Sequence, residues 1–287
     1  MRKGRIPFFF LALTLTVSGL IFLSLRTKVY GPIGTHQAKN QKAPAFLTRG
    51  KSVPEQGKMA RSVALLENAR EAYRSINGYQ AIFDKQELRE DGSWNKERTF
   101  IKFNKPFTIF LGWMEGNAKG RQVLYSQGDF EGKMMVRVPG FFNLLPLIRL
   151  KPDDPRLAKT EKHSITTAGI GYFLEEFAES FYESKEKNQL KILSLRDEVI
   201  EGEKGTLVDV LYMDSEDGYP RTGVVFSKSH GLPIEVRLYS DEDHLVESYR
   251  YLKLTVDPNR DDDNFKQHSD ARMFRLYQKV ARASWAD

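Results

Sequence analysis

The chain has 287 residues, a formal net charge of +6, 40% hydrophobic residues and no cysteine. A chain of this length holds one large domain or two, and without cysteine it carries neither a disulfide scaffold nor a lipid-modified N-terminal cysteine. The positive charge lies in residues 1–62, which hold eleven basic residues and one acid and leave 33 basic and 37 acidic residues for the remainder. Nucleic-acid binding is therefore excluded, because it requires basic side chains clustered on a folded face.

Residues 1–28 are predicted to form a signal anchor or a signal peptide. Arg2, Lys3 and Arg5 precede an uncharged run from Ile6 to Leu25, which is long enough to cross a bilayer. An uncleaved anchor is favoured, because the apolar run continues past the small residues at which a signal peptidase could cut. The basic leader also favours an N-terminus inside the membrane and a domain outside it.

Residues 29–60 are predicted to be a flexible basic tether, because they are rich in Pro, Gly, Gln, Ala and Lys and poor in large apolar residues. Their charge suits either contact with anionic lipid headgroups or a solvated linker. The folded domain is predicted to span residues 61–287. It opens with a helix, since apolar residues recur at helical spacing from Leu65 to Ile76 and Asn77-Gly78 follows as a stop signal.

A first group of strands follows this helix. Residues 79–86 alternate in polarity, and Asp91-Gly92 marks a turn. Four further strands are predicted at 99–103, 107–114, 123–125 and 133–138. The connections are short, so the strands are expected to be antiparallel neighbours in a meander.

A second helix and a second meander complete the domain. Ile170, Phe173, Leu174, Phe177 and Phe181 predict an amphipathic helix over about residues 167–184. Five more strands are predicted, at 190–200, 207–213, 223–227, 234–239 and 245–256, and a short helix from about Met273 to Val280. About ten strands and two or three helices indicate a single α+β domain.

Two stretches hold more apolar residues than an ordinary half-exposed sheet needs. In the strand 107–114, Phe107, Ile109, Leu111 and Trp113 point to one face while Phe110 and Met114 point to the other. Something apolar is expected to cover both faces, such as a helix on one and a cavity or ligand on the other.

The second stretch is residues 141–150, FFNLLPLIRL, which is too short to span a membrane and has no regular period. A buried core loop, a lid over a pocket and a loop touching a membrane or partner are the three alternatives. The flanking Pro139-Gly140 and Pro152 favour a position at the rim or in a lid.

The order of several short motifs resembles a known family. The segments GYQAIFDKQELREDGSW, IKFNKPFTIFLGW and GRQVLY, with SYRYLKLTVDPNRDDDNF near the end, resemble the bacterial outer-membrane lipoprotein carriers of the LolA-like fold. A closer resemblance is to an uncharacterised family of secreted bacterial proteins that shares the KPF and GR-V-LY motifs and the element seen here as KHSITTAGIG. Together the motifs cover most of residues 61–266.

The resemblance implies a strongly curved antiparallel sheet, an incomplete β-barrel built of two meanders, with helices at or in its concave side. It also implies a protein of the bacterial envelope, either anchored in the inner membrane with its domain in the periplasm or secreted to the periplasm. The expected ligand is a lipid or a lipoprotein acyl chain, and an envelope protein is a further possible partner. The expected anchor departs from the soluble carriers and favours a receptor, sensor or local chaperone over a shuttle.

The candidate ligand-binding residues are the aromatic and aliphatic side chains of the first meander and of the apolar stretch. They are Phe83, Ile101, Phe103, Phe107, Ile109, Leu111, Trp113, Tyr125, Phe141, Phe142, Leu144 and Leu145. The alternative is that they form ordinary core. The protein would then be an interaction, sensor or structural module with a fully packed interior.

No catalytic residue, metal site or cofactor is predicted, since no nucleophile elbow, phosphate loop or zinc spacing occurs. Arg121 either pairs with an acidic ligand headgroup or lies at the surface. His163 is expected to hold the entrance of the second helix, and Asp261-Asp262-Asp263 is expected to be a solvated turn. The sequence thus favours a binding protein over an enzyme.

Overall fold

The computed structural model describes residues 55–89, 91–139, 147–154, 164–213, 219–258 and 263–283. The first helix, α1, spans Glu55–Ser75 and so begins before the predicted domain start at residue 61. Within the described ranges no helix combines the length and the hydropathy needed to cross a bilayer. The predicted anchor, residues 1–28, lies outside those ranges.

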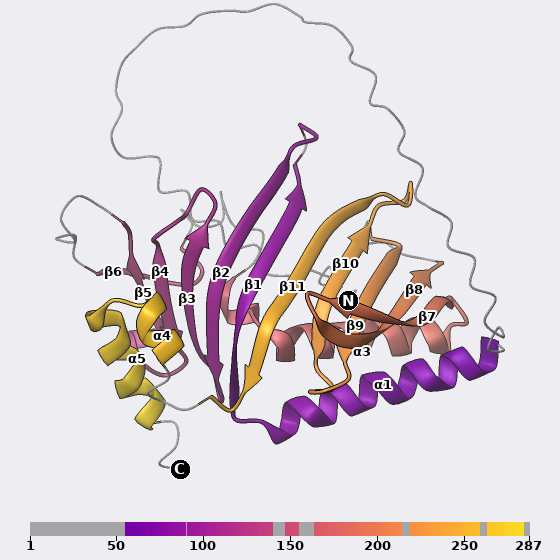
Figure 1. Cartoon of the computed structure of the whole chain (residues 1–287), viewed down its shortest axis with the longest axis horizontal. Coiled ribbons are helices and arrows are strands. Elements are labelled where there is room, and N and C mark those ends of the chain that lie inside the picture. Colours follow the sequence, from indigo (N-terminus) through magenta and orange to yellow (C-terminus); the bar gives the residue numbers. More distant parts are fainter. Residues whose placement is uncertain are drawn as a thin grey trace, which may run out of the picture.

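The described strands form one antiparallel sheet of eleven strands, in the order β6-β5-β4-β3-β2-β1-β11-β10-β9-β8-β7 (Figure 1). The first meander holds β1 (Gly78–Leu88), β2 (Trp94–Asn104), β3 (Thr108–Glu115), β4 (Gln122–Ser126), β5 (Met134–Arg137) and β6 (Ile148–Leu150). The second holds β7 (Leu190–Ile200), β8 (Glu203–Tyr212), β9 (Arg221–Ser227), β10 (Pro233–Tyr239) and β11 (Leu245–Val256). The two meanders join where β1 pairs with β11. The predicted α+β class with an unclosed antiparallel sheet is confirmed.

One face of the sheet packs against α1 and α3 (Ile170–Glu186), and we call it the α3 face. Every second residue of β1 from Tyr79 to Phe83 lies on it, opposite Phe103, Ile101 and Thr99 of β2. A short 3-10 turn, Ile165–Thr167, precedes α3. Its Ser164 hydroxyl accepts a hydrogen bond from the Thr166 amide, which orders the approach to the helix.

The opposite face, the α5 face, is covered by α4 (Asp263–His268) and α5 (Ala271–Ala283). Phe100, Phe110, Leu124 and Met135 pack there against Phe265, Met273 and Tyr277 of the two helices. The Asp270 carboxylate caps α5 by accepting from the Met273 amide at 2.8 Å. The second apolar face of β3 is therefore covered by helices, which agrees with the expectation that something apolar covers it.

The second meander is strongly curved. Adjacent strands lie about 4.8 Å apart, so a flat sheet would separate β7 from β11 by about 19 Å. Instead Ile200, at the end of β7, and Leu254 of β11 pack on one small cluster with Val225. Glu201, in the turn after β7, lies 3.9 Å from Arg250 of β11. The end of β7 consequently curls over the α5 face, as the ribbon in front of β9 shows (Figure 1).

The last three residues of the apolar stretch, Ile148–Leu150, form the edge strand β6 against β5. The sequence did not predict this strand, because three residues carry too little period to be recognised. Leu150 is buried on the α3 face, while Ile148 is exposed. Leu147 is half-buried against the cluster of the α5 face. Residues 141–146 lie outside the described residues, so the choice between core loop and lid stays a prediction.

Candidate functional site

The α3 face brings together most of the side chains predicted to bind an apolar ligand. Seven of them are buried, with exposed fractions of 8% or less, in the one cluster that includes α3: Phe83, Ile101, Phe103, Ile109, Leu111, Trp113 and Tyr125. Phe107 is half-buried at the edge of this cluster, edge-on to Phe103 and Tyr125. The other four, Phe141, Phe142, Leu144 and Leu145, lie outside the described residues. We call the seven buried side chains the apolar floor.

Helix α3 packs its aromatic stripe into the same cluster as the floor. Phe173, Phe177 and Phe181 recur every fourth residue, so they share one helix face. The ring centroids of Phe173 and Phe177 are 5.6 Å apart, and those of Phe177 and Phe181 are 5.9 Å apart. All three rings are buried in the same cluster as the floor.

Polar contacts hold α1 and α3 together. The Arg70 guanidinium of α1 is 2.7 Å from the Glu175 carboxylate of α3, and the Tyr182 hydroxyl donates to Glu67 at 2.6 Å. The Tyr182 hydrogen bond and Arg70 lower the pKa of the Glu67 carboxyl. The two helices therefore form one cover on the α3 face.

The start of α3 is fixed by β1. The Ile170 amide donates to the Tyr79 hydroxyl at 3.1 Å, which satisfies one of the free N–H groups at the helix N-terminus. Gly169 precedes it at a φ of 104°, a conformation that residues with a Cβ rarely adopt. A Cβ at Gly169 would lie 2.7 Å from the Tyr79 hydroxyl, so the contact also excludes any larger residue.

Replacing Gly169 with alanine is expected to loosen α3 from the sheet. The fully buried Tyr79 ring cannot swing away, so the new methyl must displace the helix start. Gly202→Ala is the matched control, because Gly202 has a φ of 90° and a Cβ added there would meet no atom within 4 Å. In urea unfolding, Gly169→Ala is expected to cost about 1 to 3 kcal/mol more than Gly202→Ala. Equal losses would show that the Tyr79 contact does not hold the helix.

A buried charged cluster continues the α3 face beyond the floor, and the sequence reasoning missed it. Lys85 Nζ lies 3.1 Å from Glu87 Oε2 and 3.5 Å from Glu97 Oε2. The Trp113 indole points its N–H at Glu97, 3.4 Å away. Lys85, Glu87 and Glu97 are each 7% exposed or less. The two-residue alternation of β1 could have revealed this cluster, since Lys85 and Glu87 follow Phe83 on the same side of the strand.

Two tyrosines extend this cluster from the second meander. The Tyr249 hydroxyl is 2.6 Å from Glu247 and 3.0 Å from Glu87, and Tyr219 donates to Glu247 at 2.7 Å. Burial and the neighbouring carboxylates raise the pKa of Tyr249 well above its usual value. Both tyrosines therefore remain protonated donors to the carboxylates. The cluster lies where the two meanders meet, beside the indole of Trp113 from the floor.

Arg121 belongs to this polar end and not to the surface. It is 5% exposed, and its guanidinium carbon lies 5.6 Å from the centroid of the Trp113 ring. Of the two sequence-based alternatives, a surface position is therefore wrong. A cation over an indole face is stabilised by the ring quadrupole.

At a pH above the pKa of Glu97, the substitution Glu97→Gln is expected to stabilise the fold. Burial raises the pKa of the Glu97 carboxyl, although Lys85 opposes this, and its Oε1 has no hydrogen-bond partner among the described residues. A raised folded-state pKa means that ionised Glu97 destabilises the fold, and that the penalty disappears as the pH falls below the unfolded value. Thermal unfolding should show a higher midpoint for Glu97→Gln at about pH 8 and no difference at about pH 4. A lower midpoint at pH 8 would contradict this account.

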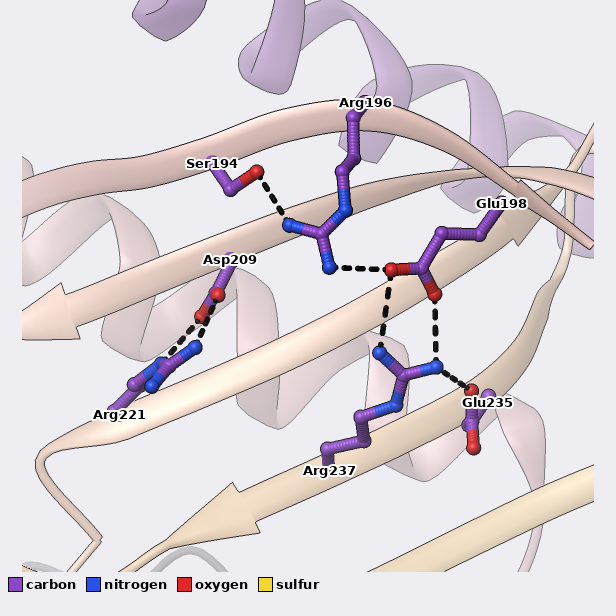
Figure 2. Close-up of polar contacts among 7 residues, drawn as sticks. All are labelled: Ser194, Arg196, Glu198, Asp209, Arg221, Glu235 and Arg237. Atoms are coloured by element: carbon purple, nitrogen blue, oxygen red, sulfur yellow. Dashed lines mark hydrogen bonds and ion pairs between the residues drawn. The ribbon is translucent and has the colours of Figure 1, made fainter. Parts of the chain in front are cut away.

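The α5 face of the second meander carries a charge network that is balanced within itself (Figure 2). Arg237 of β10 bonds Glu198 of β7 at 2.8 Å and also Glu235, and Arg196 bonds Glu198 at 2.6 Å. Beside it Arg221 makes two bonds to Asp209, at 2.9 and 2.7 Å.

This network ties strands that are not neighbours. On a flat sheet β10 and β7 would lie about 14 Å apart, too far for the contact between Arg237 and Glu198. Arg237 lies opposite Gly223 of β9, which places no side chain beneath it. Burial alone would lower the pKa of Arg237, but its bonds to Glu198 and Glu235 raise it above the ordinary value. We interpret the network as a structural tie that holds the curl of β7.

A separate cleft of about 490 Å³ opens on the α5 face between β1, β2, β11 and α4. Ile82, Phe100 and Leu252 form part of its lining, and His268 of α4 stacks on Phe100 with ring centroids 4.8 Å apart. Ala81 lines it from β1, but none of the twelve predicted binding residues does. In the described ranges, no three His, Cys, Asp or Glu side chains are grouped to hold a metal ion. His163 and residues 261–262 lie outside those ranges.

The family model of DUF1571, described as a protein of unknown function, matches residues 76–274, from the end of α1 into α5. The chain belongs to the DUF1571 family. The resemblance to an uncharacterised bacterial family is confirmed by this match. No curated protein matches this DUF1571 chain.

Solved structures are similar to this DUF1571 chain at low identity. The Pseudomonas aeruginosa MucA/MucB complex matches with 14% identity and a TM-score of 0.39 over 72% of this chain and 60% of that one. The Mycobacterium tuberculosis lipoprotein LppX matches with 12% identity and a TM-score of 0.41, over 71% and 99%. A LolA-superfamily protein of Nitrosomonas europaea matches with 14% identity and a TM-score of 0.34, over 77% and 100%. The chain spans about 60% of the length of that MucB match. These likenesses carry no argument about residues or ligands.

Proposed function

We propose that the protein is a bacterial envelope protein that binds the acyl chain of a lipid or lipoprotein on its α3 face. The apolar floor receives the chain, and the buried polar cluster around Lys85 and Glu97 lies where the floor ends. Residues 1–28 hold the protein in the inner membrane with the domain in the periplasm, or are cleaved so that the domain is secreted there. The proposal assigns the protein no catalysis and leaves room for an envelope protein as a second partner.

The observation that carries this proposal is that α3 packs in one apolar cluster with the floor of an unclosed sheet and is joined to β1 through the hydrogen bond from its Ile170 amide to Tyr79. A helix makes its backbone hydrogen bonds internally, so α3 can shift without breaking any bond of the sheet ladder. The cost of such a shift is the apolar area exposed, about 25 cal/mol per Å². An acyl chain lying on Leu111 and Trp113 would cover that area again. The free energy lost when the helix shifts would then be nearly recovered when the ligand binds.

The second candidate is an interaction or structural module whose interior stays packed. The low exposure of the floor favours it, as do the contacts of Arg70 with Glu175 and of Tyr182 with Glu67. In such a module α3 would never leave the floor, and partners would bind only to the outside of the domain.

Native purification of the full chain, followed by extraction and mass spectrometry, tests the proposal. We expect a co-purifying molecule with an acyl chain, and uptake of a fluorescent fatty acid after that molecule has been removed. Neither a bound lipid nor any uptake would contradict the proposal and favour the packed module.

A cross-link tests whether α3 must move. The chain has no cysteine of its own, so Arg70→Cys/Glu175→Cys can be joined by a short bis-maleimide across the 2.7 Å ion pair that these residues form. The linked protein is expected to take up fatty acid more slowly than the same double variant left unlinked, which is the matched control. Equal rates would show that uptake does not require α3 to separate from α1.

A further inference from the structure

Helix α5 carries basic residues and no acid on a domain that is otherwise acidic. Its sequence holds Arg272, Arg275, Lys279 and Arg282, whereas the chain after residue 62 has more acids than basic residues. Arg272, Arg275 and Lys279 are exposed, while Met273, Tyr277 and Val280 are buried against the sheet. The helix therefore presents a basic face to the outside.

This arrangement of charges destabilises the helix itself. Arg272 and Arg275 are three residues apart, and Arg275 and Lys279 four apart, so like charges repel along one face. Arg272 and Arg275 also lie near the N-terminus, where the helix dipole disfavours cations. Within the described ranges neither Arg275 nor Lys279 has an ion pair. No ion pair in the described part of the chain therefore offsets this repulsion at Arg275 and Lys279.

The basic face continues onto neighbouring elements. Lys266 of α4 is exposed, and its ammonium lies 3.4 Å from the exposed Asp263 carboxylate of the same helix and 5.8 Å from the centroid of the half-buried Phe274 ring of α5. Arg149 of β6 is exposed and pairs with Met135, whose side chain packs under α5, so Arg149 points to the same face of the sheet. Figure 1 shows α4 and α5 beside the first meander, away from α1.

We propose that Lys266, Arg272, Arg275, Lys279 and Arg149 form a docking surface for a bilayer rich in anionic lipid. Because the apolar face of α5 is already packed on the sheet, the contact is electrostatic and peripheral, not an insertion. Each basic residue near an anionic membrane surface contributes about 1 kcal/mol, and salt screens the attraction. The acidic remainder of the domain is repelled by the same surface, so the charge distribution would orient the protein with α5 toward the membrane.

A single fluorophore on α5 can report this contact separately from any membrane binding by residues 1–62. An environment-sensitive dye is attached to Ala271→Cys on the exposed start of α5 or, as the control site, to Lys191→Cys on β7. Each labelled full-length protein is titrated with phosphatidylcholine vesicles, with and without phosphatidylglycerol. We expect a blue shift at Ala271→Cys only, with the phosphatidylglycerol vesicles only, and its loss at high salt.

The Arg275→Gln/Lys279→Gln variant tests the surface itself. Removing two charges is expected to weaken vesicle binding, so that the lipid concentration giving the half-maximal shift at Ala271→Cys rises about 30-fold. Lys191→Gln/Lys204→Gln, which removes two exposed charges from the second meander, is expected to leave the shift unchanged. The proposal would be overturned by equal shifts at both dye positions, by a shift on phosphatidylcholine alone, or by equal effects of the two variants. Absence of any shift would also overturn it and would leave the basic face to solvent or to an acidic protein.

Discussion

Phe177→Ala is expected to lower the free energy of unfolding by about 3 to 5 kcal/mol and to increase the uptake of fatty acid. Phe177 of α3 is fully buried in the cluster that contains the floor, where its ring lies beside those of Phe173 and Phe181. Removing its ring loosens the cover and leaves space above the floor, which an acyl chain would fill. Urea unfolding gives the stability, and titration with a fluorescent fatty acid gives the uptake.

The matched control is Phe110→Ala on the opposite face. Phe110 is also fully buried and packs edge-on against Phe265 under α5, with ring centroids 4.8 Å apart. Its loss of stability should be similar, because the same ring is removed from an equally buried site. Fatty-acid uptake should not rise. A rise in both variants would show that any cavity in this domain takes up the probe, and would remove the α3 face from the account.

Lys85→Met is expected to destabilise the domain by about 3 to 5 kcal/mol at neutral pH. Lys85 is 2% exposed, and its ammonium forms ion pairs with both Glu87 and Glu97. Without it both carboxylates keep their charge in a buried site with no ammonium beside them. The loss should shrink at about pH 4, because burial raises the pKa of the Glu97 carboxyl and protonated Glu97 no longer needs the ammonium. Urea unfolding at both pH values measures the two losses.

Two comparisons separate this effect from the loss of any lysine. Lys96→Met, on the exposed side of β2, should change the free energy of unfolding by less than about 0.5 kcal/mol. Adding Glu97→Gln to Lys85→Met should recover part of the lost stability, because one unpaired charge is removed. If the double variant is as unstable as Lys85→Met alone, the pairing of Lys85 with Glu97 does not stabilise this end of the sheet.

The strands were predictable because the alternation of apolar and polar residues is visible within each strand's own sequence. The bounds of β7 and β11 agree with the sequence prediction, since alternation over eleven or twelve residues leaves little choice of register. The aromatic stripe of α3 likewise predicted a helix with one buried face. The seven floor residues were predicted to lie together, and they do. Whether they bind a ligand stays a prediction.

What was missed depends on neighbours distant in the sequence. Lys85 and Glu87 look like solvent-facing charges in β1, but they are buried, and their partners Glu97 and Tyr249 come from other strands. The surface alternative for Arg121 failed for the same reason, since Trp113 of another strand lies against it. The cover on the α5 face was also unpredictable, because the pattern of α5 shows that one side is buried but not which face of the sheet it covers.

Quenching of Trp113 by an acyl chain is the most direct test of the proposed site. The chain has three tryptophans, so Trp94→Phe/Trp285→Phe leaves only the buried Trp113 of the floor. If a brominated fatty acid lies on the floor, it will quench Trp113 at saturation, because bromine quenches an indole only at close contact. A bound fatty acid that leaves Trp113 unquenched would place the chain elsewhere, such as the cleft beside Phe100, and would contradict the account.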